Sequence, residues 1–192
     1  MAWDDDQDSE RAWWGDCAST YTEETKQLVY ASRMGLVAQH INGQWPLYDL
    51  QGRSVLDVGG GPVSLLLKTY NRSRAAVVDP CEYPAWVGHR YAAAGISYLR
   101  QPGETDLPTG YDEVWIYNVL QHTQDPERII GNAKEAAPTI RLFEWIGVPA
   151  HEGHPHELRA DLLDRWLGDL GQVEQMDDGH CVGISYSGVF RA

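Results

Sequence analysis

The segment that most constrains the fold covers residues 54–68, with the sequence SVLDVGGGPVSLLLK. Its first five residues form a short apolar run interrupted only by Asp57, which is typical of a central parallel strand covered on both faces. Gly59, Gly60 and Gly61 follow at once, and glycine permits a sharp turn while leaving the backbone open to a ligand. A proline and further apolar residues then predict a helix that returns onto the sheet. The segment therefore predicts the first strand, turn and helix of a nucleotide-type α/β fold.

Two other nucleotide-binding motifs match this segment less well. The dinucleotide fingerprint G-x-G-x-x-G needs a third glycine where this chain has Ser64. A P-loop closes on Gly-Lys-Ser/Thr, whereas Lys68 and Thr69 come too late and lack that glycine. A purely structural alternative is that the glycines form a tight turn and that Asp79 caps a helix.

The glycine turn and the end of the next strand together resemble motif I and the following acidic position of class I S-adenosylmethionine-dependent methyltransferases. The matching residues are D-V-G-G-G-P from Asp57 and the aspartate at the end of A-A-V-V-D, Asp79. The resemblance implies that the glycines pass under the methionine and ribose of S-adenosyl-L-methionine, and that Asp79 holds both ribose hydroxyls. A carboxylate suits that task because it can accept two hydrogen bonds at once. Asp57 and Pro80 are expected in the same cofactor site.

A loop after the third predicted strand extends the resemblance. In the family this loop carries an acidic or amide group that meets the adenine amino group, and Glu104 follows a glycine here. Because the commoner family residue is aspartate, the adenine contact is open between Glu104, Thr105 and a backbone group.

The segment YDEVWIYNVLQHTQDP, residues 111–126, carries the most specific resemblance after the glycines. It is similar to the fD-x-v…vLeHv-x-D-P segment of small-molecule methyltransferases, the group that includes quinone-biosynthesis enzymes. The resemblance adds Asn118 and Val119 to the expected cofactor site. It implies methyl transfer to a small-molecule acceptor, whose identity and reacting atom the sequence leaves open.

His122 is the first catalytic candidate because it follows the strand expected at residues 114–117, at the sheet edge where open α/β sheets bind ligands. Methyl transfer from a sulfonium is an in-line displacement that aligns two reactants and, for a hydroxyl, amine or acidic carbon, removes a proton. Histidine suits that step near neutral pH. We therefore expect His122 to act as general base or acceptor-orienting group; the alternative is that it only orders its loop. The strand expected at residues 139–146 brings a second candidate, Glu144, to the same edge.

The N-terminal segment is expected to cover the acceptor. Trp13 and Trp14 are adjacent and lie outside any periodic segment, so they must pack against the body of the fold or a ligand. Class I methyltransferases often carry such a cover, so the resemblance adds Tyr21 to these two tryptophans as acceptor contacts. For each of these residues, packing in the core is the alternative.

A histidine-rich loop follows the fifth predicted strand. His151, His154 and His156 are spaced as H-x-x-H-x-H, a pattern that also suits zinc or iron. Similar histidine and proline segments occur in methyltransferases that need no metal. We therefore expect these residues to contact the acceptor and expect no metal site.

The order of the predicted elements gives the fold class. A helix from Thr20 to Gly43 precedes the first strand, five strand and helix units alternate, and a hairpin with a turn at Asp178–Gly179 follows. This order predicts an α/β protein with a doubly wound, Rossmann-like sheet of seven strands, mostly parallel with one antiparallel strand near the edge. We expect one domain over 1–192, with a helical cover over 1–50 and the core over 51–192.

Composition bears on the partners. The formal net charge is −13, with 28 acidic residues against 15 Lys and Arg, so a phosphate backbone is repelled on average. The Pro-Pro pair of DNA amino-methyltransferases is absent after Asn118. Three dispersed cysteines and no apolar run of about 18 residues favour a cytoplasmic protein without a membrane span. The remaining alternatives are a non-catalytic S-adenosylmethionine- or nucleoside-binding protein and a methyltransferase acting on nucleic acid or protein. The oligomeric state is open.

Overall fold

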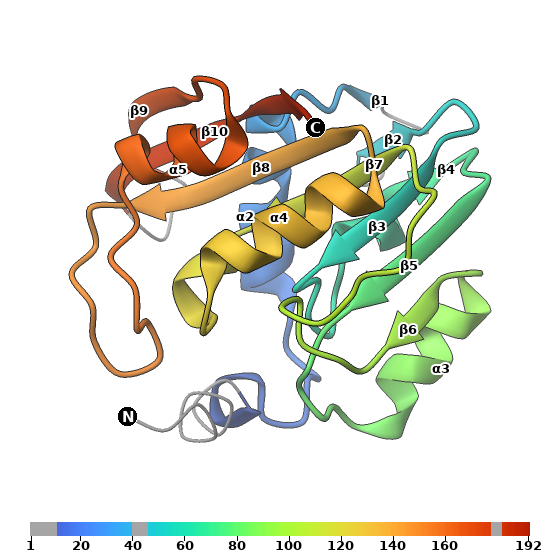
Figure 1. Ribbon diagram of the computed structural model, residues 1–192. Coiled ribbons are helices and arrows are strands. Elements are labelled where there is room, and N and C mark those ends of the chain that lie inside the picture. The colour runs from blue at the N-terminus through green and yellow to red at the C-terminus, as the bar shows by residue number, and fades with distance from the viewer. Residues whose placement is uncertain (1–10, 40–45, 178–181) are drawn as a thin grey trace.

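The computed structural model describes residues 11–39, 46–177 and 182–192 (Figure 1). Residues 11–14 are helical. The further helices are α2 (Tyr21–Arg33), α3 (Ala85–Ala93), α4 (Pro126–Ala136) and α5 (Ala160–Leu167), with two short 3-10 helices, η1 (Leu65–Lys68) and η2 (Leu120–His122). Within these described ranges, no helix is both long enough and apolar enough to cross a membrane.

The strands form two sheets. The main sheet contains β3 (Ser54–Val58), β5 (Arg74–Val78), β6 (Ser97–Leu99), β7 (Glu113–Tyr117), β8 (Thr139–Ile146), β9 (Gln172–Asp177) and β10 (Val182–Arg191). A small sheet contains β1 (Ala38–Gln39), β2 (Leu47–Asp49) and β4 (Thr69–Tyr70).

The main sheet has the predicted topology. Its seven strands lie in the order β6-β5-β3-β7-β8-β10-β9, and the first five of these are parallel. Strand β10 runs antiparallel to both of its neighbours, β8 and β9. The α/β, Rossmann-like class with one antiparallel strand near the edge is therefore confirmed. The turn expected at Asp178–Gly179 lies outside the described residues.

Helices cover the sheet on both faces, and β3 shows how the sequence causes this. All five residues of β3 are buried. Leu56 and Val58 pack in one hydrophobic cluster with Ile129 of α4, whereas Val55 packs in the other cluster with Tyr30 of α2. Figure 1 shows α4 and α5 in front of the sheet and α2 behind it. Because both faces are covered, the strand is apolar at nearly every position, as the sequence suggested.

The helix expected after the glycine turn does not form. In its place the chain makes only the 3-10 helix η1 and then pairs with β2 through β4. Ser64 is extended, with ψ 145°, and its N–H donates to the Tyr91 hydroxyl at 2.8 Å. The next N–H, that of Leu65, donates to the Tyr117 hydroxyl at 2.9 Å. Tertiary hydrogen bonds thus satisfy the backbone groups that a helix start would otherwise leave unpaired.

The N-terminal helix α2 stops at Arg33, nine residues before the predicted end region at Asn42. Gly35 adopts φ +72° and the Leu36 N–H donates to the Ala31 carbonyl at 2.9 Å, while the Gly35 N–H donates to Ser32. This pair of bonds is a Schellman motif, which terminates helices at a glycine. Val37, which the predicted helix would have included, is 82% exposed.

Candidate active site

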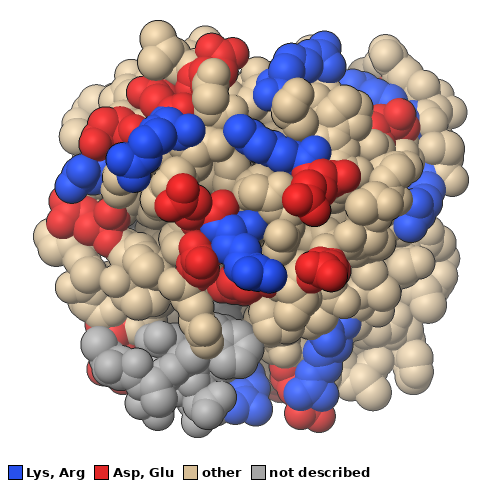
Figure 2. Space-filling view, in the orientation of Figure 1, with Lys and Arg blue, Asp and Glu red and all other residues tan. Residues whose placement is uncertain are grey.

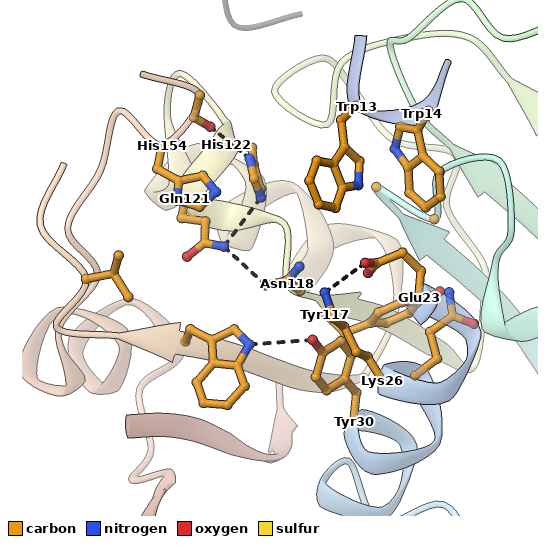
Figure 3. A pocket seen from close by; sticks show the side chains of 17 residues that line it. Trp13, Trp14, Glu23, Lys26, Tyr30, Tyr117, Asn118, Gln121, His122 and His154 are labelled. Atoms are coloured by element: carbon orange, nitrogen blue, oxygen red, sulfur yellow. Dashed lines mark hydrogen bonds and ion pairs between the residues drawn. The ribbon is translucent and has the colours of Figure 1, made fainter. Parts of the chain in front are cut away.

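A cavity of about 440 Å³ lies where β3, β7 and β8 end, and this volume falls within the roughly 300–1,000 Å³ typical of small-molecule sites. The N-terminal segment, α2, the glycine turn and the loops after β7 and β8 all contribute to its lining. The lining residues are Trp13, Trp14, Glu23, Lys26, Gln27, Tyr30, Gly59, Gly60, Gly61, Tyr117, Asn118, Gln121, His122, Trp145, Val148, Gly153 and His154. Figure 3 shows how these side chains surround the cavity.

The glycine turn forms one wall, and its geometry requires glycine. Gly59 and Gly61 have φ values of +75° and +61°, which residues with a Cβ rarely adopt. A Cβ on Gly59 would lie 2.5 Å from the Val119 methyl groups, and one on Gly60 would lie 2.7 Å from Asp57 Oδ2. The wall is therefore bare backbone, a surface that a ligand can approach closely.

Asp57 lies behind this wall and is fully buried. The hydroxyls of Ser64 and Tyr117 both donate to its Oδ2, the second over 2.6 Å. Its Oδ1 has no hydrogen-bond partner among the described residues. Burial raises the pKa of Asp57 to about 7, although the two hydroxyls oppose this rise. Asp57 does not line the cavity, and it fixes the segment that leaves the glycine turn.

Asp79 is held against the same turn from β5. Its Oδ2 accepts from the Gly61 N–H at 3.0 Å and its Oδ1 accepts from the Cys81 N–H at 2.9 Å. Helix α3 begins with Pro84 as N-cap and has no side-chain cap, so Asp79 does not cap that helix. The Trp14 ring lies 3.5 Å from the position of a Cβ on Gly61, so Trp14 covers this end of the turn. Asp79 and the half-buried Pro80 are not part of the cavity lining.

The loop expected at the adenine also lies outside the lining. Glu104 Oε1 accepts from the Gln124 N–H at 2.9 Å, and the Thr105 hydroxyl donates to the Pro102 carbonyl at 2.7 Å. These bonds fix the loop against the start of α4, where the Asp125 N-cap side chain accepts from the Arg128 N–H. The contact of Glu104 or Thr105 with adenine stays a prediction.

The loop after β7 is fixed by Glu144 of β8. Glu144 is 0% exposed, and its Oε1 accepts from the N–H groups of Val119 and Leu120, both at 3.0 Å. Burial raises the pKa of Glu144 to about 8, and the two hydrogen bonds oppose this rise. Asn118, in the left-handed region with φ +55°, points its side chain at the cavity and accepts from Gln121 Nε2 at 3.1 Å. Glu144 itself does not line the cavity, and its carboxylate shapes the loop that does.

His122 faces the cavity from the end of this loop. Its Nδ1 lies 2.8 Å from the Gly153 carbonyl, which accepts but cannot donate, so the neutral ring carries its proton on Nδ1. Nε2 is then an acceptor, and it lies 3.4 Å from Gln121 Nε2. His154 meets this ring edge-on with centroids 4.3 Å apart. Burial, and then the neighbouring His122 and His151, lower the pKa of His154 to about 4, so His154 is neutral at pH 7.

The remaining acceptor candidates divide into two groups. Trp13 and Trp14 line the cavity as expected. Tyr21, His151 and His156 do not: Tyr21 is 67% exposed, His151 packs beside His154, and His156 Nε2 lies 3.1 Å from the Gln124 carbonyl. Throughout the described part of the chain, no group of three or more His, Cys, Asp or Glu side chains is placed to hold a metal ion.

The structure adds lining residues that the sequence analysis missed. Four of them come from α2: Glu23, Lys26, Gln27 and Tyr30. Their spacing of three, four and seven residues from the first is one face of a helix, so a periodicity signal was present. Trp145, at the end of β8, adds an aromatic ring whose Nε1 lies 3.5 Å from the Tyr30 hydroxyl.

Comparison with solved structures identifies the fold. The 1,6-didemethyltoxoflavin-N1-methyltransferase of Burkholderia thailandensis, solved with its namesake ligand and S-adenosylhomocysteine, is 14% identical with a TM-score of 0.59, covering 96% of this chain and 82% of that one. The magnesium protoporphyrin IX methyltransferase of Synechocystis, solved with S-adenosylmethionine, is 16% identical with a TM-score of 0.59, covering 96% and 90%.

A third similar chain comes from the complex of the Haloferax volcanii Trm112 methyltransferase activator with its methyltransferase partner. It is 15% identical with a TM-score of 0.66, and the match covers 98% of both chains. No protein-family model matches the sequence, and a search of curated proteins finds no significant match. The protein therefore has the Rossmann-like fold of class I methyltransferases, and at these identities the likeness shows the fold alone.

Proposed function

We propose that the protein transfers a methyl group from S-adenosyl-L-methionine to a small-molecule acceptor. The observation that carries the proposal is a cavity of small-molecule size with a bare glycine wall on one side and a histidine pair on the other. Two proteins of the same fold were solved with S-adenosylmethionine or S-adenosylhomocysteine, and one of these also with a small-molecule ligand. The narrower likeness to quinone-biosynthesis enzymes rests on residues 111–126 alone.

The residues at the glycine wall fit the proposed cofactor. A Cβ would fill the wall at Gly59 and Gly60, and Asn118 and Val119 border it from β7. Asp79 is bound to the Gly61 N–H, so its carboxylate lies beside the wall, where it is proposed to hold the ribose hydroxyls. The sulfonium of S-adenosylmethionine, when bound, supplies an activated methyl group.

The other side of the cavity suits an acceptor. In the neutral tautomer favoured by the Nδ1 bond to Gly153, His122 has an unprotonated Nε2, and a general base needs such an atom. His154 is neutral at pH 7 and therefore adds no charge that would oppose proton uptake by His122. We propose that His122 accepts the acceptor's proton or orients the acceptor, while Trp13, Trp14 and His154 contact its surface.

A nucleic-acid acceptor is disfavoured by charge. The net charge is −13. On the face in Figure 2, described Lys and Arg side chains lie among Asp and Glu side chains rather than in one continuous patch. Binding to a phosphate backbone depends on such a basic surface.

Ligand-induced stabilisation tests the cofactor proposal. At 100 times its dissociation constant, S-adenosylmethionine should stabilise the fold by about 2.7 kcal/mol. That corresponds to roughly 5 °C or more in melting temperature for a chain of this size. NAD serves as the control and should have no effect. An unchanged melt with S-adenosylmethionine and S-adenosylhomocysteine, or a larger shift with NAD, contradicts the proposal. Binding without any methylated product across a broad acceptor screen would favour a non-catalytic binding protein.

A further inference from the structure

Two charged side chains of opposite sign face the cavity from α2. Among the described lining residues, Glu23 and Lys26 are the only Asp, Glu, Lys or Arg side chains. Lys26 Nζ lies 2.8 Å from Glu23 Oε1, and each side chain is 16% exposed. Figure 3 shows them on one side of the cavity, across from His122 and His154. The cavity thus has one end with a fixed positive and negative pair and another end with uncharged imidazoles.

A second set of contacts fixes this pair next to the glycine turn. Gln27 Nε2 donates to the Val63 carbonyl at 2.6 Å, two residues after the last glycine of the turn. Lys68 Nζ lies 3.2 Å from Glu24 Oε2 and donates to Gln27 Oε1 at 3.3 Å. Lys68 is buried, so water competes little for its contacts with Glu24 and Gln27. Helix α2 is therefore attached to the segment that leaves the turn, and the charges beside the cavity are preorganised.

We propose that Glu23 and Lys26 bind the zwitterionic α-amino acid end of a ligand, with Lys26 taking the carboxylate and Glu23 the ammonium. A ligand that breaks the pair must replace both partners, because a partly buried charge without a partner is costly. A phosphate or a simple amine would satisfy one side chain and leave the other facing a like charge or none. A zwitterion satisfies both.

This inference rests on the proposed function, since S-adenosylmethionine carries such an end. The position agrees with it, because Glu23 and Lys26 line the same cavity as the glycine wall. The pair is not part of the motifs by which the chain resembles methyltransferases, which lie beyond residue 50. The site thus belongs to the N-terminal segment of this chain.

One pair of nucleosides tests the site by calorimetry. S-Adenosylhomocysteine carries the α-amino acid group and 5′-methylthioadenosine lacks it. Wild-type protein should bind the first about 10- to 100-fold more tightly, the usual worth of a hydrogen bond to a charged group expressed as a ratio. Lys26→Met should remove most of this preference and leave 5′-methylthioadenosine binding unchanged. Lys134→Met on α4, outside the cavity lining, is the matched control and should bind as wild type.

Decarboxylated S-adenosylmethionine separates the two roles, because it keeps the ammonium and lacks the carboxylate. Lys26→Met should bind this compound at least as tightly as wild type does, because no lysine ammonium is left without a partner, whereas Glu23→Gln should bind it more weakly. The double variant Glu23→Gln/Lys26→Met leaves neither charge unpaired, and it provides the same comparison if a single variant folds poorly.

The outcomes separate this site from the proposed function. Equal wild-type affinities for S-adenosylhomocysteine and 5′-methylthioadenosine would overturn the site and leave the cofactor proposal standing. A Lys26→Met loss shared equally by both compounds would likewise overturn it, since the loss would then not depend on the amino acid group. Wild-type protein that binds neither compound would refute the proposed function, and this site with it.

Discussion

The buried side chain of Glu144 allows a prediction about how the stability of the fold depends on pH. Its carboxyl group is fully buried and accepts two backbone N–H bonds from the loop that carries Asn118 and His122. Replacement by glutamine keeps a carbonyl oxygen for those bonds and removes the ability to ionise. Glu144→Gln therefore isolates the titration of this one group from its hydrogen bonding.

The direction and size of the change in the free energy of unfolding follow from the pKa of Glu144 in the folded and unfolded states. The Glu144 pKa is about 8 in the folded state, against an ordinary value of 4.5. Between these values the folded state holds a proton that the unfolded chain has released, so the free energy of unfolding falls as pH rises. The contribution is complete below pH 4.5 and lost above pH 8. At 1.36 kcal/mol per pKa unit, the loss is on the order of 5 kcal/mol.

Urea denaturation followed by tryptophan fluorescence, repeated from about pH 5 to about pH 9, measures this loss. Glu144→Gln should gain stability relative to wild type as pH rises through this window. The glutamine amide leaves one buried donor without a partner, which costs roughly 1–3 kcal/mol at every pH and does not affect the slope. Asp57 is present in both proteins, so its contribution to the pH dependence cancels when the two stability curves are subtracted. Parallel curves for the two proteins would show that the carboxyl group is not raised, and the argument from burial would fail.

Two further substitutions test the proposed roles around the cavity. Asp79→Ala should weaken S-adenosylhomocysteine binding by about 1.5–3 kcal/mol, measured by calorimetry, because it removes a charged hydrogen-bond acceptor from the ribose; unchanged affinity would show that the ribose contact is misassigned. His122→Ala should lower turnover about a hundred- to ten-thousand-fold in a methyl-transfer assay while cofactor affinity stays near wild type. His156→Ala, on the histidine-rich loop after β8 and outside the lining, is its control, and full activity in His122→Ala would remove His122 from the mechanism.

The sequence predicted the elements whose signals are local. Strand β3 is an apolar run because both of its faces are covered. Helix α4 begins at Asp125–Pro126 because the cap and the proline both act within one turn. The helix expected after the glycine turn failed because the hydroxyls of Tyr91 and Tyr117, distant in sequence, take its backbone N–H groups. The small strands β1, β2 and β4 are two or three residues long, too short for any period to appear.

Only some of the cavity-lining residues were predicted, because the others can be recognised only from contacts between distant parts of the sequence. The glycines, Asn118, His122 and His154 line the cavity and were identified from motif position. Tyr30 packs in the core and also lines the cavity, so its apolar ring alone indicates only the buried face of α2. The polar series from Glu23 lies on the cavity side of the same helix and resembles any solvated face until tertiary contacts are known.

The buried carboxylates show why position alone does not assign a role. Asp57, Asp79 and Glu144 all lie near the carboxyl ends of parallel strands, where ligands bind and where turns leave backbone N–H groups unpaired. An acidic side chain at this edge can therefore bind a ligand or accept hydrogen bonds from a turn. Its hydrogen-bond partners show which of these roles it has. Asp57 and Glu144 are 0% exposed and lie outside the lining, so a ligand in this cavity cannot reach them. Asp79 also lies outside the lining, but it is 5% exposed, and its Oδ2 accepts from the N–H of Gly61, which does line the cavity. This contact with the cavity wall is why Asp79, unlike the other two acids, is proposed to bind the ribose of the cofactor as well as to brace the glycine turn.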